Sequence, residues 1–302
     1  MVCGIADVGS NTIRLSIYKC ENGEGRLLLN RKVTAGLAGY VQQGALTQDG
    51  IHVACQTLLR FRTLLDNLEI SDFHVFATAS LRNISNTEVA VRAITADTGL
   101  RVDVLSGREE AALSFRGAIR DAERDDGLLV DLGGGSTELV SYTARNIQTA
   151  CSLPAGSLSL FNRCVSGLHP TKGERKAIRD TVENLLERYV PQRTNTKYIC
   201  GVGGTIRAAC KVANLFFDRP AEQRTLETEA LRTLLRRYRD VDRPALELLL
   251  KAAPDRIHTL LPGMLALDVV ARAYGAERIT VSSCGVREGY LYSRVLEQGR
   301  ES

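Results

Sequence analysis

The sequence of 302 residues lacks the features of membrane and secreted proteins. No apolar run approaches the ~18 residues that span a bilayer. The first residues reach the acidic Asp7 without a basic segment ahead of a hydrophobic one, as a leader peptide would have. We therefore expect a cytoplasmic protein without membrane partners.

Motifs of metal-binding and nucleophilic cysteine are also missing. The eight cysteines are scattered, with no C-x-x-C pair and no histidine at zinc-ligand spacing, so we expect reduced thiols in the core. There is no C-x₅-R loop, and the four histidines follow no pattern with a nucleophile. Cysteine-phosphatase and Ser-His-Asp mechanisms are therefore not supported.

Composition and charge are those of an ordinary globular protein. Hydrophobic residues make up 44% of the sequence, charged residues 25%, and the net charge is +4. Arginine suits bidentate contacts with phosphate, so a polyanionic ligand is compatible with this balance. The densest arginine cluster, at 232–243, is typical of a solvated helix face. No recognition motif accompanies it, and nucleic acid is not expected as a partner.

One pattern occurs twice along the chain. Residues 5–13 and 129–139 each show an apolar strand that ends in Asp (Asp7, Asp131), a Gly-rich turn with small polar residues, and a second strand. Strands and helices then alternate, which predicts an α/β fold of two duplicated domains, 1–124 and 125–302, that flank a cleft. The last helix could also pack back on the first domain.

Local signals place the individual elements. Strands are expected at 73–78, 100–105, 197–201 and 278–282, and the longest helix at about 47–67. The S/T-x-x-E pattern of a capping box begins at Ser85, Ser106 and Thr171, and we expect a helix to start at each.

Three glycine-containing turns are candidates for phosphate binding. Backbone N–H groups can approach phosphate oxygens only where side chains are small, and hydroxyl or amide groups can share the remaining lone pairs. Two of these turns are the duplicated ones, and the third leads from a strand into a helix. The candidate residues are Ser10, Asn11, Thr12, Gly134, Gly135, Ser136, Thr137, Gly203, Gly204 and Thr205.

Six short segments with distinctive residues follow one another along the sequence, at 7–12, 78–82, 106–111, 131–138, 203–205 and 285–289. Together they resemble the Ppx/GppA family of exopolyphosphatases and guanosine pentaphosphate phosphohydrolases. The resemblance implies ribonuclease H-like domains of the actin-like ATPase superfamily. Because the sequence ends at Ser302, it resembles the short, two-domain form that lacks a C-terminal HD-type domain.

Two neighbouring carboxylates are candidates for the catalytic base. Glu109 is the third residue after Ser106, so it is expected to close a capping box. Glu110 lies ~100° further around the helix and is free to point elsewhere. The resemblance also places the base that activates water at Glu110.

Metal and phosphate ligands are expected near the duplicated turns. Carboxylates and phosphate oxygens suit Mg²⁺ or another divalent cation, for which the candidates are Asp131 and Glu138, with Asp7 as a further one. Arg82 matches a position of the family and is a candidate phosphate ligand.

These features predict a hydrolase that acts on phosphoanhydride bonds. It would release the terminal phosphate of inorganic polyphosphate or the 5′-γ-phosphate of pppGpp, as a monomer or a homodimer. Two alternatives stay open, namely a small-molecule kinase of the same superfold and a nucleotide-sensing module without turnover.

Overall fold

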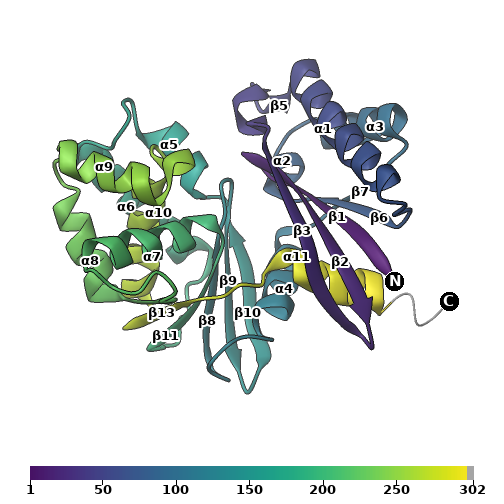
Figure 1. Cartoon of the computed structure of the whole chain (residues 1–302). Coiled ribbons are helices and arrows are strands. Elements are labelled where there is room, and N and C mark those ends of the chain that lie inside the picture. The colour runs from purple at the N-terminus through teal and green to yellow at the C-terminus, as the bar shows by residue number, and fades with distance from the viewer. Residues whose placement is uncertain (298–302) are drawn as a thin grey trace. The chain divides into compact units, whose positions relative to one another are not determined.

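Two β-sheets, each with its own helices, organise the computed structural model, which describes residues 1–297 (Figure 1). Unit 1 contains Met1–Leu113 and the chain from Val286 onward, and unit 2 contains Ser114–Gly285. The division falls inside helix α4 (Gly107–Ala118), earlier than the boundary suggested by the sequence. No helix in residues 1–297 is long and apolar enough to cross a membrane.

The sheet of unit 1 has the order β3-β2-β1-β6-β7. Strand β1 pairs with β2 antiparallel and with β6 parallel, and β6 pairs with β7 parallel. The strands are β1 (Val2–Val8), β2 (Thr12–Glu21), β3 (Glu24–Thr34), β6 (Phe73–Ala77) and β7 (Val102–Val104), with a small hairpin of β4 (Val41–Gln42) and β5 (Ala45–Leu46). The helices are η1 (Leu37–Tyr40), α1 (Gln48–Asn67), α2 (Ala79–Arg82), α3 (Thr87–Thr98), α4, α11 (Val286–Tyr290) and η3 (Leu291–Leu296).

The sheet of unit 2 repeats this arrangement in its first five positions, with the order β10-β9-β8-β11-β13-β12. Strand β8 pairs antiparallel with β9 and parallel with β11, and β12 adds an antiparallel edge. The strands are β8 (Gly127–Leu132), β9 (Thr137–Thr143), β10 (Asn146–Leu153), β11 (Tyr198–Val202), β12 (Thr225–Glu227) and β13 (Arg278–Val281). The helices are α5 (Ser157–Cys164), α6 (Lys172–Tyr189), α7 (Gly204–Phe216), α8 (Thr228–Arg237), α9 (Arg243–Ala252), η2 (Pro254–Arg256) and α10 (Leu260–Ala273). The predicted duplicated α/β fold is confirmed.

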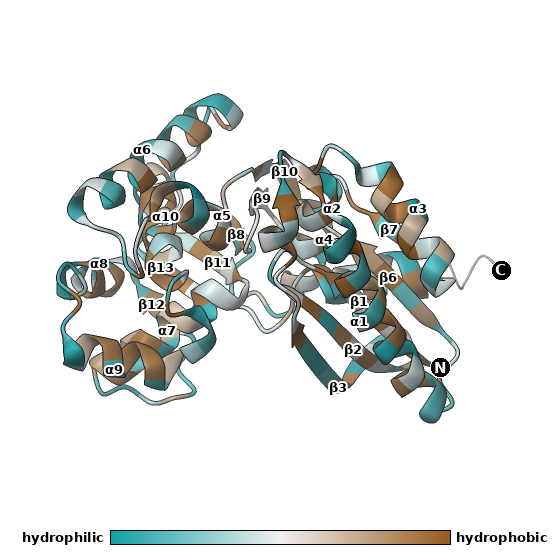
Figure 2. Ribbon diagram, turned by 90° about the horizontal axis from the view of Figure 1, so that it is seen from above, coloured by the Kyte–Doolittle hydropathy of each residue, from teal (hydrophilic) through white to brown (hydrophobic). Residues whose placement is uncertain are grey.

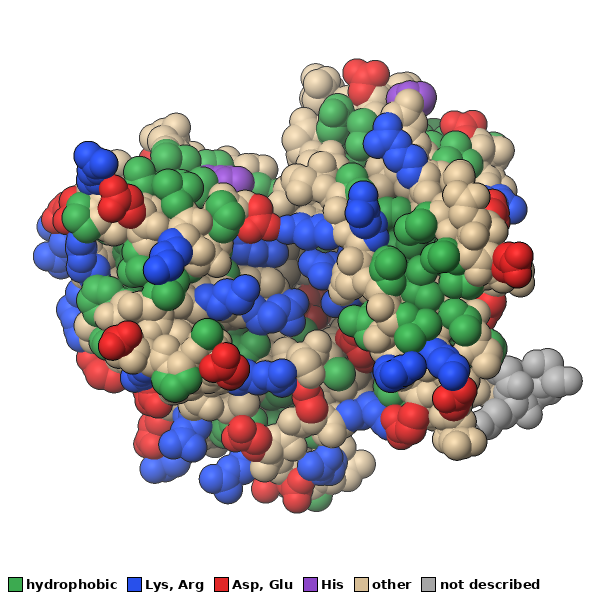
Figure 3. Space-filling model, in the orientation of Figure 1, with side chains coloured by type: hydrophobic (Ala, Val, Ile, Leu, Met, Phe, Trp, Pro, Cys, Tyr) green, Lys and Arg blue, Asp and Glu red, His purple; other side chains and the backbone are tan. Residues whose placement is uncertain are grey.

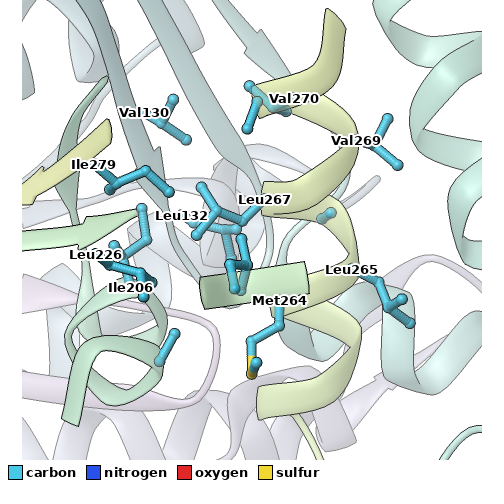
Figure 4. Packing of buried hydrophobic residues seen from close by; sticks show 14 of the residues in the cluster. Val130, Leu132, Ile206, Leu226, Met264, Leu265, Leu267, Val269, Val270 and Ile279 are labelled. Carbon is cyan, nitrogen blue, oxygen red and sulfur yellow. The ribbon is translucent and has the colours of Figure 1, made fainter. Parts of the chain in front are cut away.

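Helix α10 is the centre of the core of unit 2. Every residue from Leu260 to Ala271 is buried, as expected for a mostly apolar helix, and the one acid among them, Asp268, pairs with Arg232 and Arg272. Figure 4 shows Leu267 of this helix beside Leu132 of β8. The outer helices α6, α8 and α9 instead show hydrophobic and hydrophilic bands (Figure 2). This core fixes the end of β8, from which the glycine turn leaves.

Unit 1 has hydrophobic clusters on both faces of its sheet. One lies under α1 and α3, and the other joins β1 to the last helical segment through Tyr290, Leu291 and Val295. Five of the eight cysteines are buried, and all eight are free thiols. Burial raises the pKa of Cys151 and of Cys210 to about 11, which keeps these thiols protonated at neutral pH.

The expected capping boxes form at two positions of three. Ser106 with Glu109 and Thr171 with Glu174 make the reciprocal hydrogen bonds. The box expected at Ser85 is wrong, because α3 begins at Thr87 after Asn86, and the amide of Asn86 pairs instead with both backbone groups of Leu46.

Several arginines of the 232–243 segment form ion pairs at the surface of unit 2, and Arg232 also pairs with the buried Asp268. Arg236 pairs with Glu229 and Arg237 with Asp242. The predicted solvated helix face is thus confirmed.

Candidate active site

The turn of unit 1 is held by its own backbone. The N–H of Gly9 donates to the carbonyl of Thr12 at 3.1 Å. A Cβ on Gly9 would lie 2.9 Å from that oxygen, which favours glycine there. The carbonyls of Ser10 and Asn11 each accept an N–H at 2.9 Å, from Ala38 and Gly36 at the start of η1. A helical start thus braces the turn.

The turn of unit 2 is built the same way. Gly133 donates to the carbonyl of Ser136 at 3.1 Å, while the carbonyls of Gly133 and Gly134 accept the N–H groups of Ser157 and Leu158 at 2.9 Å. These donors belong to the first turn of α5, so in both units N–H groups at the start of a helix hold the glycine turn in place.

Three successive N–H groups of this second turn are available. In residues 1–297, those of Gly134, Gly135 and Ser136 donate to no protein acceptor. Consecutive unpaired N–H groups make an anion-binding concavity. This turn therefore suits a phosphate group.

The third glycine turn lies against the end of β8. Gly203 has φ of 96° and precedes α7, and a Cβ there would lie 2.6 Å from the carbonyl oxygen of Leu132. The same position is 3.1 Å from Oδ1 of Asp131. Within unit 2, the start of α7 is therefore next to the strand that carries the second turn, and its N-terminal N–H groups add to the attraction for an anion.

Sequence reasoning missed Arg256, whose guanidinium lies over the start of α7. A Cβ on Gly204 would come within 2.2 Å of Nη2 of Arg256. Burial lowers the pKa of Arg256, the charge of the neighbouring Asp255 partly opposes this shift, and no described carboxylate forms an ion pair with Arg256. A cation at the positive end of a helix is unfavourable unless an anion lies nearby. No local pattern signals this residue, because the contact joins positions far apart in the sequence.

Arg82 and Glu110 come together in unit 1. Nη1 of Arg82 lies 2.6 Å from Oε2 of Glu110 and also donates to the carbonyl of Leu105 at 3.0 Å. Glu110 is only 7% exposed. Arg82 is the last residue of the short helix α2, which follows β6. The guanidinium favours the ionised carboxylate, which is the form that can accept a proton.

Glu109 has a different environment. Its Oε2 accepts the N–H of Ser106 at 2.9 Å, and Oε1 accepts from Arg294 at 2.9 Å. Hydrogen bonding from Ser106, helped by the charge of Arg294, lowers the pKa of Glu109. The predicted capping role of Glu109 is confirmed.

Two buried carboxylates face each other on neighbouring strands of unit 2. Asp131 of β8 and Glu138 of β9 are register partners, so their side chains lie on the same face. Asp131 accepts from Ser114 at 2.5 Å and Glu138 from Ser152 at 2.7 Å. Two like charges in this position repel, and a hard cation would remove the repulsion.

The donor set therefore fits a divalent cation, although not a closed protein cage. No group of three or more His, Cys, Asp or Glu residues suited to a metal occurs in the described part of the chain. Mg²⁺ commonly takes one or two carboxylates and completes its shell with water and phosphate oxygens. Asp7 differs from Asp131, because its register partner on β2 is Arg14.

Two of the candidate hydroxyl groups are used inside unit 2. Thr137 donates to the carbonyl of Ala155 at 2.5 Å, and Thr205 donates to Ser157 at 3.2 Å. Both threonines are buried. Their hydroxyl groups are therefore already used as donors within unit 2.

Comparison with known proteins identifies relatives over nearly the whole chain. Residues 16–298 match the model of the Ppx/GppA phosphatase family. Proteins called exopolyphosphatase 1 from Mycobacterium bovis and Mycobacterium tuberculosis are 25% identical, over 98% of this chain and 88% of theirs.

Solved structures agree in fold. An exopolyphosphatase from Cytophaga hutchinsonii is 24% identical with a TM-score of 0.84, covering 99% of this chain and 98% of that one. A Ppx/GppA family member from Aquifex aeolicus has a TM-score of 0.80 at 24% identity and the same coverage. The chain belongs to the Ppx/GppA phosphatase family, which confirms the resemblance and the predicted class of enzyme, a hydrolase of phosphoanhydride bonds.

Proposed function

We propose that this protein releases the terminal phosphate of inorganic polyphosphate by hydrolysis. The observation that carries the proposal is the set of unpaired N–H groups at Gly134, Gly135 and Ser136. The start of α7 and the guanidinium of Arg256 add positive potential in the same unit. Such donors suit a terminal phosphate, and relatives named exopolyphosphatase support this choice of substrate.

Glu110 is the proposed base. Its carboxylate would accept a proton from a water molecule, whose oxygen attacks the terminal phosphorus while the bridging P–O bond breaks. The bridging oxygen leaves with the shortened chain, and the products are orthophosphate and a polyphosphate one unit shorter. Arg82 lies 2.6 Å from the carboxylate of Glu110 and is itself a candidate ligand for phosphate oxygens.

Backbone donors would contribute most of the electrostatic stabilisation. Charge on the oxygens of the transferred phosphoryl group is met by N–H groups that are already oriented, so little reorganisation is needed. Gly134, Gly135, Ser136, Gly203 and Gly204 would serve in unit 2, and Ser10, Asn11 and Thr12 in unit 1.

Asp131 and Glu138 would hold a divalent cation such as Mg²⁺. A bound cation would neutralise part of the charge of the phosphate chain. Ser114 and Ser152 would orient the two carboxylates through their hydroxyl groups.

The 5′-γ-phosphate of pppGpp ends in the same kind of phosphoanhydride bond, so it is a second proposed substrate. A kinase would instead need an acceptor. The test measures orthophosphate release from polyphosphate and from pppGpp without any acceptor, with Mg²⁺ present. We expect release that depends on Glu110. Phosphate transfer from ATP only when a sugar or carboxylate acceptor is added would contradict hydrolysis.

A further inference from the structure

A second group of cationic side chains lines a cavity of about 200 Å³ in unit 2, beyond the proposed site for the terminal phosphate. The cationic lining residues are Arg207 and Lys211 of α7 and Arg224, which precedes β12. Figure 3 shows Lys and Arg side chains gathered on the face of unit 2 that carries α7. The only acidic residue in this lining is Glu222, so positive charge is in excess.

Two of these cations lack protein partners. Neither Lys211 nor Arg224 forms an ion pair or a side-chain hydrogen bond with any residue of 1–297. Asp121, which lies nearby, is already bonded to the hydroxyl groups of Ser282 and Ser283 at 2.6 Å. Unneutralised cations around one cavity attract a multivalent anion.

The cavity follows directly from the start of α7. The N–H of Arg207 donates to the carbonyl of Gly203 at 3.3 Å, so Arg207 lies in the first turn of the helix. Lys211 is four residues later, on the same side of the helix. The backbone of Arg224 is fixed at the end of β13, where its carbonyl accepts the N–H of Val281 at 2.8 Å. The three cations thus extend away from the glycine turn along one side of α7.

We propose that this cavity is a distal subsite for internal phosphates of a polyphosphate chain whose terminal phosphate occupies the glycine turns. This inference rests on the proposed function, because it takes the terminal phosphate to lie at Gly134, Ser136 and Gly204. A short chain ends before the cavity, whereas a longer one reaches Lys211 and Arg224. The affinity for substrate therefore rises with chain length in the range where the subsite fills.

The test compares tripolyphosphate with a longer polyphosphate on the double variant Lys211→Glu/Arg224→Glu. Charge reversal should raise KM for the longer chain by about tenfold, but change KM for tripolyphosphate by less than about twofold. A matched control is Arg193→Glu, because Arg193 lies before β11 at the opposite end of these strands and is not among the residues that line the cavity. If the charge-reversed variant does not fold, the milder Lys211→Gln/Arg224→Gln variant replaces it. This variant should also raise KM for the longer chain only, by a smaller factor.

Equal changes in KM for both chain lengths, or no change for either, would overturn the subsite. If the unaltered protein hydrolyses no polyphosphate, the proposed function fails, and direct binding then decides about the subsite. Calorimetric titration with the longer polyphosphate should show binding that is weakened in the double variant and unchanged in Arg193→Glu. Equal binding by all three proteins would reject the cavity as a polyanion site.

Discussion

The two units carry the same turn but different chemistry around it. In both, a glycine N–H closes the turn on a carbonyl three residues later, and the start of a helix braces the turn. In unit 1 the Asp before the turn lies opposite Arg14, whereas in unit 2 it lies opposite Glu138. The two turns therefore share the same backbone hydrogen bonds, but the residue opposite the aspartate is positively charged in unit 1 and negatively charged in unit 2.

This difference assigns separate tasks to the two units. An arginine as register partner can offset the charge of an acid, whereas two carboxylates on one face of a sheet can share a hard cation. Unit 1 also holds the Glu110–Arg82 pair, whereas unit 2 holds the carboxylates of Asp131 and Glu138 on neighbouring strands. We therefore propose that unit 1 supplies the base and unit 2 the carboxylates for the cation, while the turns of both units donate N–H groups to phosphate.

The largest effect is expected for the base. Glu110→Gln keeps the size of the side chain but cannot accept a proton, so kcat should fall on the order of 10²–10⁴-fold while polyphosphate binding persists. Glu109→Gln is the matched control, since Gln can also close the capping box, and its turnover should stay near that of the unaltered enzyme. Phosphate-release kinetics on both variants decide this. A dead Glu109→Gln enzyme with an active Glu110→Gln would reverse the assignment.

The next largest effect is expected at Asp131, and it should distinguish this residue from Asp7, its counterpart in unit 1. Asp131→Asn or Glu138→Gln should abolish the binding of Mg²⁺ and lower kcat by about 10²-fold or more, because the cation loses a carboxylate ligand. Asp7→Asn should have a smaller effect, since Asp7 lies opposite Arg14. Excess EDTA should stop the unaltered enzyme.

Calorimetry and the rise in Tm on adding Mg²⁺ provide readouts apart from activity. Full activity in EDTA, or a loss of Mg²⁺ binding only in Asp7→Asn, would contradict this division.

A smaller effect is expected from the braces of the two turns. A Cβ on Gly156 would lie 2.4 Å from the carbonyl carbon of Gly134, so Gly156→Ala must displace the turn. We expect a loss of about 1–3 kcal/mol in the free energy of unfolding and a raised KM. In unit 1, Gly36 has φ of 62° but open space around it. Gly36→Ala should therefore cost only the roughly 1 kcal/mol of a left-handed backbone, without a comparable change in KM.

Urea unfolding and KM measurements on both glycine variants test this difference. An unchanged KM in Gly156→Ala would show that the second turn needs no brace at Gly156, and an equal rise in both variants would remove the difference between the units.

Local sequence patterns predicted much of this fold, because the residues that form each glycine turn, and those that form most helix caps, lie within a few positions of one another in the sequence. The capping pair of Ser106 and Glu109 could be assigned from helix geometry alone, whereas the role of Glu110 stays a prediction. Contacts across long separations could not be predicted. The place of Arg256 over Gly204 depends on the packing of η2, and the box at Ser85 failed because Asn86 pairs with Leu46.

The hydroxyl groups of Thr137 and Thr205 give a further example. The sequence shows them as free donors in glycine-rich turns, but the braces of α5 bring Ala155 and Ser157 close enough to accept from them. The sequence pattern indicates which side chains can donate a hydrogen bond, and tertiary packing decides which acceptor each of them finds.

The smallest effect compares one capping box in each unit. Hydrogen bonds from Thr171 and then from Ser166 lower the pKa of Glu174 to about 2, and hydrogen bonding from Ser106 lowers that of Glu109. Since the folded pKa lies below the usual 4.5, each carboxylate stabilises the fold fully above that value, and the contribution is lost as the pH falls through the folded pKa. For Glu174 this loss should occur between about pH 4.5 and 2.

Titration of the side-chain carboxyl carbons by NMR should show both midpoints below 4.5, with that of Glu174 near 2. Glu174→Gln should unfold at a similar urea concentration at neutral pH, because Gln still closes the box. Below pH 4.5 the unaltered protein loses this contribution as Glu174 protonates, whereas the variant has nothing to lose there. The difference in stability should therefore shift in favour of the variant as the pH falls. An ordinary midpoint for Glu174 would mean that its bonds to Thr171 and Ser166 do not persist in solution.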